Sequence, residues 1–268
     1  MLELRTLLGA IPLAVAVAVA CPAAVSAQTA PARESHRMTL PKGTLLAQGF
    51  IEVNLSADNV IKPVSLSPDI WYGLNDDLSL GLVHSAPGSG GFYGGVGTSL
   101  CLTGEDNGCG AGVYHNLGLD ARYNLLEGVL PLAVDGGVFI SDFDPFLLAL
   151  KVGLVGKWQG PIAVIFNPNL SVGITERDAG NEEVFSLPLA TMYEITPKIS
   201  VGLQTGIVLP FTDVGNLWRI PLSVGGRFLI TGGIWAEAAF TLPAVAGGDG
   251  ITNGFDARVL TVGGGVVL

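Results

Sequence analysis

Two histidines, His84 and His115, are the residues of this chain best placed for acid–base chemistry. His84 ends one stretch of alternating polar and apolar residues and His115 begins the next, so an antiparallel pair would bring both imidazoles to one rim of a sheet. Such a pair would suit a hydrolase if a nucleophile lay beside it. Ser85, however, directly follows His84 and must point to the opposite face. We therefore interpret both histidines as interfacial side chains, because two ligands alone define neither a metal site nor a proton sensor.

A second pair of reactive residues is Cys101 and Cys109, which flank the polar, turn-rich segment LTGEDNG. Neither cysteine has the CxxC spacing of a zinc site. Oxidation is expected in an exported chain, and we predict a disulfide between the two. A bridge across so small a loop stabilises a fold by about 2 to 3 kcal/mol at most.

Acidic residues gather in segments that we expect to be loops. Carboxylates of this kind can hold divalent cations that bridge lipopolysaccharide or a partner. They lack the ordered spacing of a calcium loop such as D-x-D-x-D-G, so solvated loops are the simpler interpretation, and we predict no metal site and no cofactor. The residues are Glu105, Asp106, Asp142, Asp144, Glu176, Asp178, Glu182 and Glu183.

The first 27 residues have the composition of a signal peptide. Arg5 gives a positive start, the stretch from Leu7 to Ala20 is apolar, and Val25–Ala27 offers a small-residue cleavage site. Two alternatives are a membrane anchor, for which the apolar core ending at Pro22 is short, and lipoprotein processing at Cys21, whose preceding box lacks the usual Leu. Export is the prediction that all these features share.

The composition of the chain is unusual for a soluble protein. Only 13% of its residues are charged, 49% are apolar and 38 are glycines, whereas about 25% charged residues is usual. After residue 27, no apolar run approaches the roughly 18 to 20 residues of a membrane-spanning helix. This combination is typical of a membrane β-barrel. The net charge of −10 argues against nucleic acid and anionic lipid as partners.

From Thr44 onward, apolar and polar residues alternate in run after run, as in half-buried strands. Many runs have ten or more residues, which suits the ~9 to 11 residues that cross a membrane at a tilt. Connections after every second run are tight turns, and the intervening ones are generally longer, above all 86–112, 175–183 and 244–255. The twelve runs are 44–56, 62–74, 78–85, 113–125, 130–141, 145–158, 161–174, 184–195, 199–209, 217–230, 234–243 and 256–268.

The apolar face of these runs carries aromatic residues near the strand ends. A soluble β-sandwich or lipocalin-like barrel also alternates, but it has no reason to sort its aromatics in this way. Two rings around an aliphatic band are typical of the interfacial belts of a bilayer-facing surface. The first ring comprises Tyr72, Tyr123, Trp158, Tyr193 and Phe228, and the second Phe146, Phe185, Trp218 and Phe240.

The polar face carries ionisable residues that cannot plausibly face lipid but can line a hydrated lumen and pair there. Six acids and five bases nearly balance, so strong ion selectivity is not predicted. The alternative is that they pair across the lumen and leave little pore. The predicted lumen-lining residues are Glu52, Asp69, Asp120, Arg122, Asp135, Lys151, Lys157, Glu194, Arg219, Arg227 and Glu237.

With these features, residues 44–268 resemble the outer-membrane β-barrel superfamily of porins and small outer-membrane channels. The last run, LTVGGGVVL (Leu260 to Leu268), looks like the C-terminal assembly signal of such proteins, although it ends in Leu rather than an aromatic residue. No motif diagnostic of one family is present. The resemblance implies a location in the outer membrane, contact with its lipid, and short turns and both termini on the periplasmic side.

We therefore predict an all-β fold, a transmembrane antiparallel up-and-down barrel of about twelve strands. Residues 1–27 form the signal peptide, 28–43 a polar periplasmic tail, and 44–268 the barrel. The expected function, by analogy with the architecture, is passive passage of small solutes rather than catalysis. A structural or surface-binding barrel with a closed lumen is the alternative, and an outer-membrane lipid hydrolase is a remote one. The sequence does not specify an oligomeric state.

Overall fold

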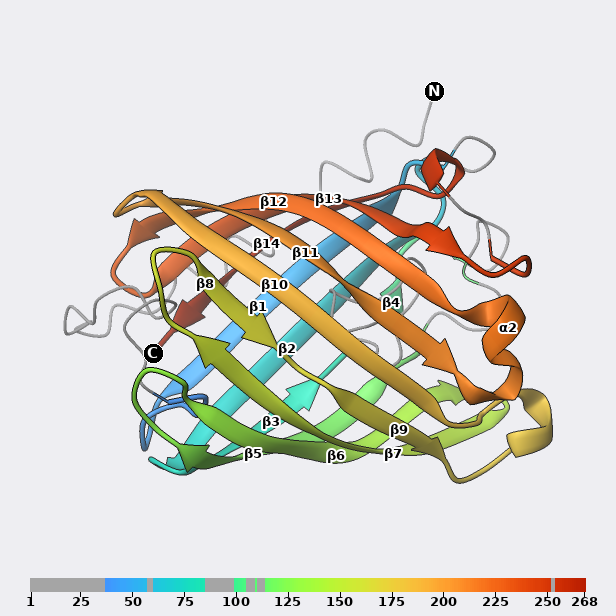
Figure 1. Ribbon diagram of the computed structural model, residues 1–268, viewed down its shortest axis with the longest axis horizontal. Coiled ribbons are helices and arrows are strands. Elements are labelled where there is room, and N and C mark those ends of the chain that lie inside the picture. Colours follow the sequence, from blue (N-terminus) through green and yellow to red (C-terminus); the bar gives the residue numbers. More distant parts are fainter. Residues whose placement is uncertain (1–36, 57–59, 85–98, 105–108, 110–113, 252–253) are drawn as a thin grey trace.

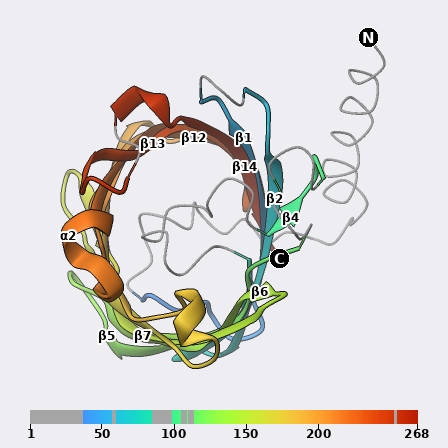
Figure 2. The same ribbon diagram turned by 90° about the vertical axis from the view of Figure 1, so that its right-hand side faces the viewer.

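The computed structural model describes residues 37–56, 60–84, 99–104, 109, 114–251 and 254–268 as one closed antiparallel sheet (Figure 1). Viewed along its axis, the sheet forms a ring (Figure 2). Its strands are β1 (Leu45–Asn54), β2 (Val64–Asn75), β3 (Leu78–Val83), β4 (Leu100–Cys101), β5 (Leu117–Leu126), β6 (Leu132–Phe143), β7 (Phe146–Trp158), β8 (Ala163–Phe166), β9 (Asn169–Gly173), β10 (Val184–Thr196), β11 (Ile199–Pro210), β12 (Arg219–Thr231), β13 (Ile234–Gly247) and β14 (Val259–Val267).

The ring closes because β1 pairs with both β14 and β2. The fourteen strands fill twelve positions, since β8 and β9 share the place between β7 and β10, and β4 lies beside β2 past the end of β3. The predicted twelve-stranded antiparallel barrel is therefore confirmed. Closure pairs the first and last strands of the described sheet with each other, as a barrel surrounded by lipid requires.

The break between β8 and β9 has a local cause. Phe166 pairs with Gly156 and Asn169 pairs with Gly153, so the two strands keep one register along β7. Between them lies Pro168, which has no N–H to donate to a neighbouring strand. The predicted run 161–174 is thus one strand interrupted by a proline.

The third barrel strand contains an insertion. Leu82 of β3 pairs with Ile70 of β2, and Leu100 of β4 pairs with Leu66 further along the same strand. These registers place His84 and Ser99 at adjacent positions beside β2. His84 and Ser99 therefore occupy consecutive places in one strand of the wall, although fourteen residues, 85–98, separate them in the sequence.

The two ends of the barrel differ. At one end, which we call the turn end, short connections join β2 to β3, β5 to β6, β7 to β8, β10 to β11 and β12 to β13. Leu45 and Leu268 also meet there, through paired backbone hydrogen bonds of 3.0 and 2.8 Å. The other end, the loop end, carries the short helices η3 (Arg177–Ala179), η4 (Phe211–Asp213), α2 (Val214–Leu217) and η5 (Gly254–Asp256).

One connection at the loop end departs from the expected pattern of longer loops. Only Asp144 and Pro145 separate β6 from β7.

None of the helices in the described residues has the length and apolar character needed to cross a bilayer.

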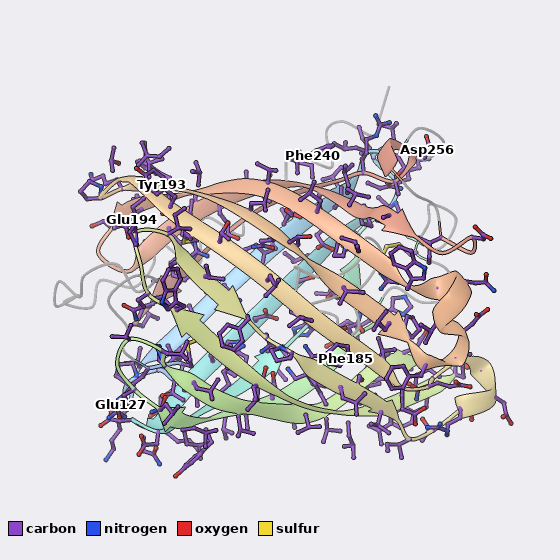
Figure 3. The ribbon with its side chains drawn as sticks, in the orientation of Figure 1. Glu127, Phe185, Tyr193, Glu194, Phe240 and Asp256 are labelled. Carbon is purple, nitrogen blue, oxygen red and sulfur yellow. A yellow bond between two sulfur atoms is a disulfide. The ribbon has the colours of Figure 1, made fainter. Side chains whose placement is uncertain are left out.

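The wall has two distinct faces. On β3, Ser79 and Val83 are 1% and 3% exposed, whereas Leu80 between them is 44% exposed. The same alternation recurs around the ring, with large aliphatic and aromatic side chains on the outer face (Figure 3). A soluble barrel would bury these side chains, so this outer face matches a hydrocarbon environment.

Candidate functional site

The eleven ionisable residues predicted to line the lumen are all buried or half-buried, and none is exposed. Five of them are at most 4% exposed: Glu52, Asp69, Asp120, Asp135 and Lys157. The structure brings some of the eleven together and leaves others apart along the barrel.

The largest cluster lies on the inner wall formed by β5, β6 and β7. The Lys151 Nζ atom lies 2.6 Å from Asp120 Oδ2 and 3.2 Å from Asp135 Oδ1. The Asn167 side-chain amide donates to Asp135 Oδ2 at 2.7 Å. Arg122 stacks on Trp71 with its guanidinium carbon 4.2 Å from the ring centroid. These charges are therefore largely compensated within the wall, which favours a role in holding the barrel together.

A second pair links β12 and β13. Arg227 Nη2 lies 2.6 Å from Glu237 Oε2, and Arg227 also stacks over Trp235 at 5.3 Å. Strands β7 and β10, which β8 and β9 separate, supply Lys157 and Glu194, whose charges attract each other. Arg219 lies at the loop-end start of β12, away from these groups.

Glu52 and Asp69 have mainly structural hydrogen bonds. Ser65 Oγ donates to Glu52 Oε2 at 3.3 Å. Asp69 accepts hydrogen bonds from the His84 backbone N–H at 2.7 Å and from Gln48 Nε2 at 3.2 Å. Asp69 thus helps to hold the point at which the chain leaves the wall.

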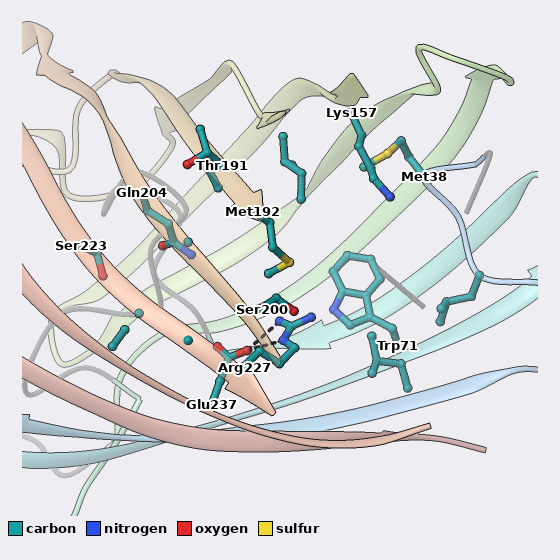
Figure 4. A pocket seen from close by; sticks show the side chains of 18 of the residues that line it. Met38, Trp71, Lys157, Thr191, Met192, Ser200, Gln204, Ser223, Arg227 and Glu237 are labelled. Carbon is teal, nitrogen blue, oxygen red and sulfur yellow. Dashed lines mark hydrogen bonds and ion pairs between the residues drawn. The ribbon is translucent and has the colours of Figure 1, made fainter. Parts of the chain in front are cut away.

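A cavity of about 330 Å³ occupies the lumen near the turn end. Figure 4 shows Trp71, Met38, Lys157 and Met192 around one space, with the Arg227–Glu237 pair on the neighbouring wall. Four predicted lumen residues line this cavity: Arg122, Lys157, Arg227 and Glu237. The other lining residues include polar Thr39, Ser79, Thr191, Ser200, Gln204 and Ser223 and apolar Met38, Leu40, Leu46, Trp71, Ile165 and Met192.

Sequence reasoning missed two kinds of residue at this site. The polar and apolar lining residues on the strands carry no charge and escaped a search based on ionisable groups. Met38, Thr39 and Leu40 lie before the first strand, in the segment 28–43 that we predicted to be a periplasmic tail, for which entry into the lumen was an open alternative. Alternation alone could have found the inward strand residues, but no signal indicates that the tail enters the lumen.

The histidines lie at the loop end, outside this cavity. The Nε2 atom of His84 lies 2.8 Å from the Tyr114 hydroxyl, and its Nδ1 atom contacts the Pro68 carbonyl oxygen. Burial raises the pKa of Tyr114. Both nitrogens of His84 are thus occupied by groups other than a serine, and Ser85 lies outside the described residues. His115 instead lies near the Cys109 carbonyl oxygen and Asp142.

The predicted disulfide between Cys101 and Cys109 is present, with 5.7 Å between the two Cα atoms. Both cysteines are buried, at 6% and 4% exposure. Cys101 lies on β4, which pairs with Ser65 of β2. The bridge therefore fastens the loop to the barrel wall.

The acidic loop residues show one clear ion pair. Arg177 contacts both carboxylate oxygens of Glu183, at 2.7 and 2.9 Å, and this hydrogen-bonded pairing lowers the pKa of Glu183. Glu105 and Asp106 lie outside the described residues. Within the described residues, no group of three or more His, Cys, Asp or Glu side chains is arranged to hold a metal ion.

Eight of the nine predicted girdle residues lie near strand ends. Five are in the turn-end half of their strands, and Phe146, Phe185 and Trp218 lie toward the loop end; Figure 3 shows Tyr193 and Phe185 at opposite ends of β10. Phe240 instead lies in the middle of β13, because this strand continues to Gly247, beyond the predicted run 234–243. Seven are exposed: Tyr72, Tyr123, Phe146, Trp158, Tyr193, Phe228 and Phe240. Phe185 and Trp218 are half-buried. Their contact with a bilayer interface stays a prediction.

Three solved structures share this architecture. The NanC porin matches with a TM-score of 0.57 at 10% identity, over 83% of this chain and 98% of that one. An outer membrane channel from Pseudomonas putida F1 matches with a TM-score of 0.52 at 11% identity, over 90% and 100%. The KdgM porin, also solved in complex with disordered oligogalacturonate, matches with a TM-score of 0.52 at 7% identity, over 82% and 98%.

The chain therefore has the fold of outer-membrane β-barrel channels and structural similarity to small channels of this kind. Identities this low establish the fold alone. No protein-family model matches the sequence, and no curated protein does. The structures that it resembles are porins and channels, not enzymes.

Proposed function

We propose that the protein is an outer-membrane channel that lets small solutes pass passively through its lumen. The observation that carries this proposal is the cavity of about 330 Å³ inside the barrel, whose lining combines charged, polar and apolar side chains. A cavity of this size is comparable to small-molecule sites of roughly 300 to 1,000 Å³. Hydrated side chains on the inner wall give a polar solute partners to replace its water.

The proposal extends to the orientation and the boundaries of the chain. Residues 1–27 act as a signal peptide, the turn end faces the periplasm, and the girdle aromatics near the strand ends mark the two membrane interfaces. The eleven ionisable residues line the lumen as a nearly balanced set. Mass spectrometry of protein extracted from outer membranes tests the first point, because the mature chain should begin at Gln28.

A structural barrel with a closed lumen is the second candidate, and one observation favours it. The Lys151 and Arg227 ion pairs lie along the wall, between strands one or two places apart, where they strengthen the barrel whether or not a solute passes. Stability and permeation are compatible roles, so permeability must be measured directly.

The test uses the mature protein, refolded and inserted into liposomes and planar bilayers. We expect liposomes to swell in small sugars and single channels to show a steady current with little preference between K⁺ and Cl⁻. Heat-unfolded protein in the same liposomes is the control. Correctly folded protein that carries neither current nor solute would refute the channel and favour the closed barrel.

A further inference from the structure

The segment just before β1 lies inside the barrel. We call residues 37–42 the inner strap. Within it, the Leu40 backbone N–H donates to Ser79 Oγ at 2.8 Å, and Ser79 is 1% exposed on the inner face of β3. An atom that donates a hydrogen bond to an inward-facing hydroxyl must itself lie inside the barrel. This part of the strap therefore lies in the lumen.

A glycine on the inner wall makes room for the strap. Gly73 lies on the same face of β2 as Trp71, and a Cβ atom at this position would stand 2.1 Å from the Pro41 carbonyl oxygen. No side chain fits there, so the close approach of strap and wall depends on glycine. The Gly43 N–H also donates to the Gly73 carbonyl oxygen at 2.8 Å.

The strap is anchored to two turns at the turn end. Arg37 pairs with Asp77 at 3.0 Å and with Glu127 at 2.5 Å. Thr39 Oγ1 donates to the Asp76 carbonyl oxygen at 2.7 Å, and the Lys42 N–H donates to Asp76 Oδ1 at 3.0 Å. Its one cation that lines the cavity, Arg37, is therefore paired with carboxylates of the turns.

Two of the four strap residues that line the cavity, Met38 and Leu40, are apolar, and the other two are Arg37 and Thr39. Met38 and Leu40 line it together with Trp71, Ile165 and Met192 (Figure 4). Leu40 also packs against the buried cluster that contains Trp71. Met38, Leu40 and Trp71 thus form an apolar patch beside Arg122 and Lys157 at one end of the lumen. An ion that passes this patch gives up water without finding a polar partner on it, which raises the cost of its passage.

We propose that the inner strap is a fixed constriction at the turn-end mouth, and that Met38 and Leu40 determine selection there against hydrated ions and in favour of small solutes with an apolar part. This inference rests on the proposed channel function. It assigns the selection of solutes to the strap, which is not part of any barrel strand. The contacts that anchor the strap can therefore be removed without altering a strand pairing.

The position of the strap is tested first, without any permeability measurement. Leu40→Cys and Ser79→Cys together place one thiol on the strap and one on the wall, at two residues whose backbone N–H and hydroxyl oxygen lie 2.8 Å apart. We expect the folded protein to form this disulfide on mild oxidation, seen by mass spectrometry as the loss of both free thiols. Thiols that stay free in the folded barrel would overturn the inference.

The constriction is tested next by single-channel conductance. Arg37→Ala combined with Gly73→Ala removes two ion pairs and puts a methyl group where the Pro41 carbonyl lies, so we expect conductance to rise at least about twofold as the mouth widens. Met38→Ser leaves every anchor in place and should give a smaller rise. Lys42→Ala, at an exposed side chain whose backbone N–H is retained, is the matched control and should leave conductance unchanged.

The outcomes separate the two proposals. A silent wild type with a conducting release variant would support the strap as a constriction and refute passive passage in the native protein. A conducting wild type whose current is unchanged by release would keep the channel and overturn the strap. Silence from both folded proteins would overturn both.

Discussion

Lys151 is the residue whose removal should most weaken the barrel. Its ammonium group contacts Asp120 at 2.6 Å and Asp135 at 3.2 Å, and the exposed fractions of the three side chains are 10%, 3% and 1%. Lys151→Met keeps most of the side-chain volume but leaves two buried carboxylates without their shared cation. Removing one partner of a buried ion pair typically costs about 3 to 5 kcal/mol.

The lower end of that range applies here. Asp135 keeps a hydrogen bond of 2.7 Å from Asn167, and Arg122 continues to attract both carboxylates. We therefore expect the free energy of unfolding to fall by about 3 kcal/mol. Equilibrium urea unfolding of the protein folded into lipid vesicles, followed by tryptophan fluorescence, measures this loss.

A second substitution provides the control. Lys151→Met with Asp120→Asn removes one buried negative charge and should recover part of the lost stability, because the cost arises from the unpaired carboxylates. A single variant that loses less than about 1 kcal/mol would show that the pair is compensated by water in the lumen. A double variant less stable than the single one would also refute the reasoning.

Three further changes have expected outcomes. Gly118→Ala places a Cβ atom 2.3 Å from a Phe139 ring carbon and should destabilise the barrel by about 1 to 3 kcal/mol in the same unfolding assay; Gly49→Ala, with open space around it, should cost less. Because the folded-state pKa of Glu183 is lowered, its stabilisation of the loop holds above the usual carboxyl pKa and is lost as pH falls through the lowered value. Amide exchange across residues 174–183 should lose protection on acidification in the wild type, and the same loss in Glu183→Gln would contradict this. Deleting residues 85–98 and joining the flanking residues should leave a barrel that folds, with unchanged heat-modifiable migration on gels; failure to fold would show that the insertion is required.

Much of the wall could be predicted because a strand imposes a side-chain period of two. In the predicted run 78–85, Leu80 and Leu82 face outward while Ser79 and Val83 face inward, as their polarity and positions along the strand indicate. The two cysteines could be paired because oxidation and a short separation leave few alternatives. The interruption at Pro168 is likewise predictable once the run is recognised as a strand, because proline cannot donate a backbone hydrogen bond.

Other features depend on tertiary register, which alternation does not encode. Ser99 continues the strand position of His84 only through pairing with β2, so alternation alone does not predict β4 in the wall. The inner strap is a similar case. Its residues show no alternation of polar and apolar types. The sequence does not distinguish Gly73 from the other glycines among the 38, and only the structure shows the Pro41 carbonyl packed against it.

The pairing of charges in the wall is the reason that we assign selection to the strap. Where acids and bases pair between neighbouring strands, as Arg227 does with Glu237, their fields largely cancel across the lumen. A lumen with a nearly even potential has little electrostatic basis for choosing between ions of opposite sign. Selection must then come from the size of the solute and from the cost of removing its water. Both effects are strongest where apolar side chains narrow the path. Among the described residues, Met38 and Leu40 of the strap meet Trp71 at such a place, so mutations there should change what passes more than neutralising a paired wall charge does.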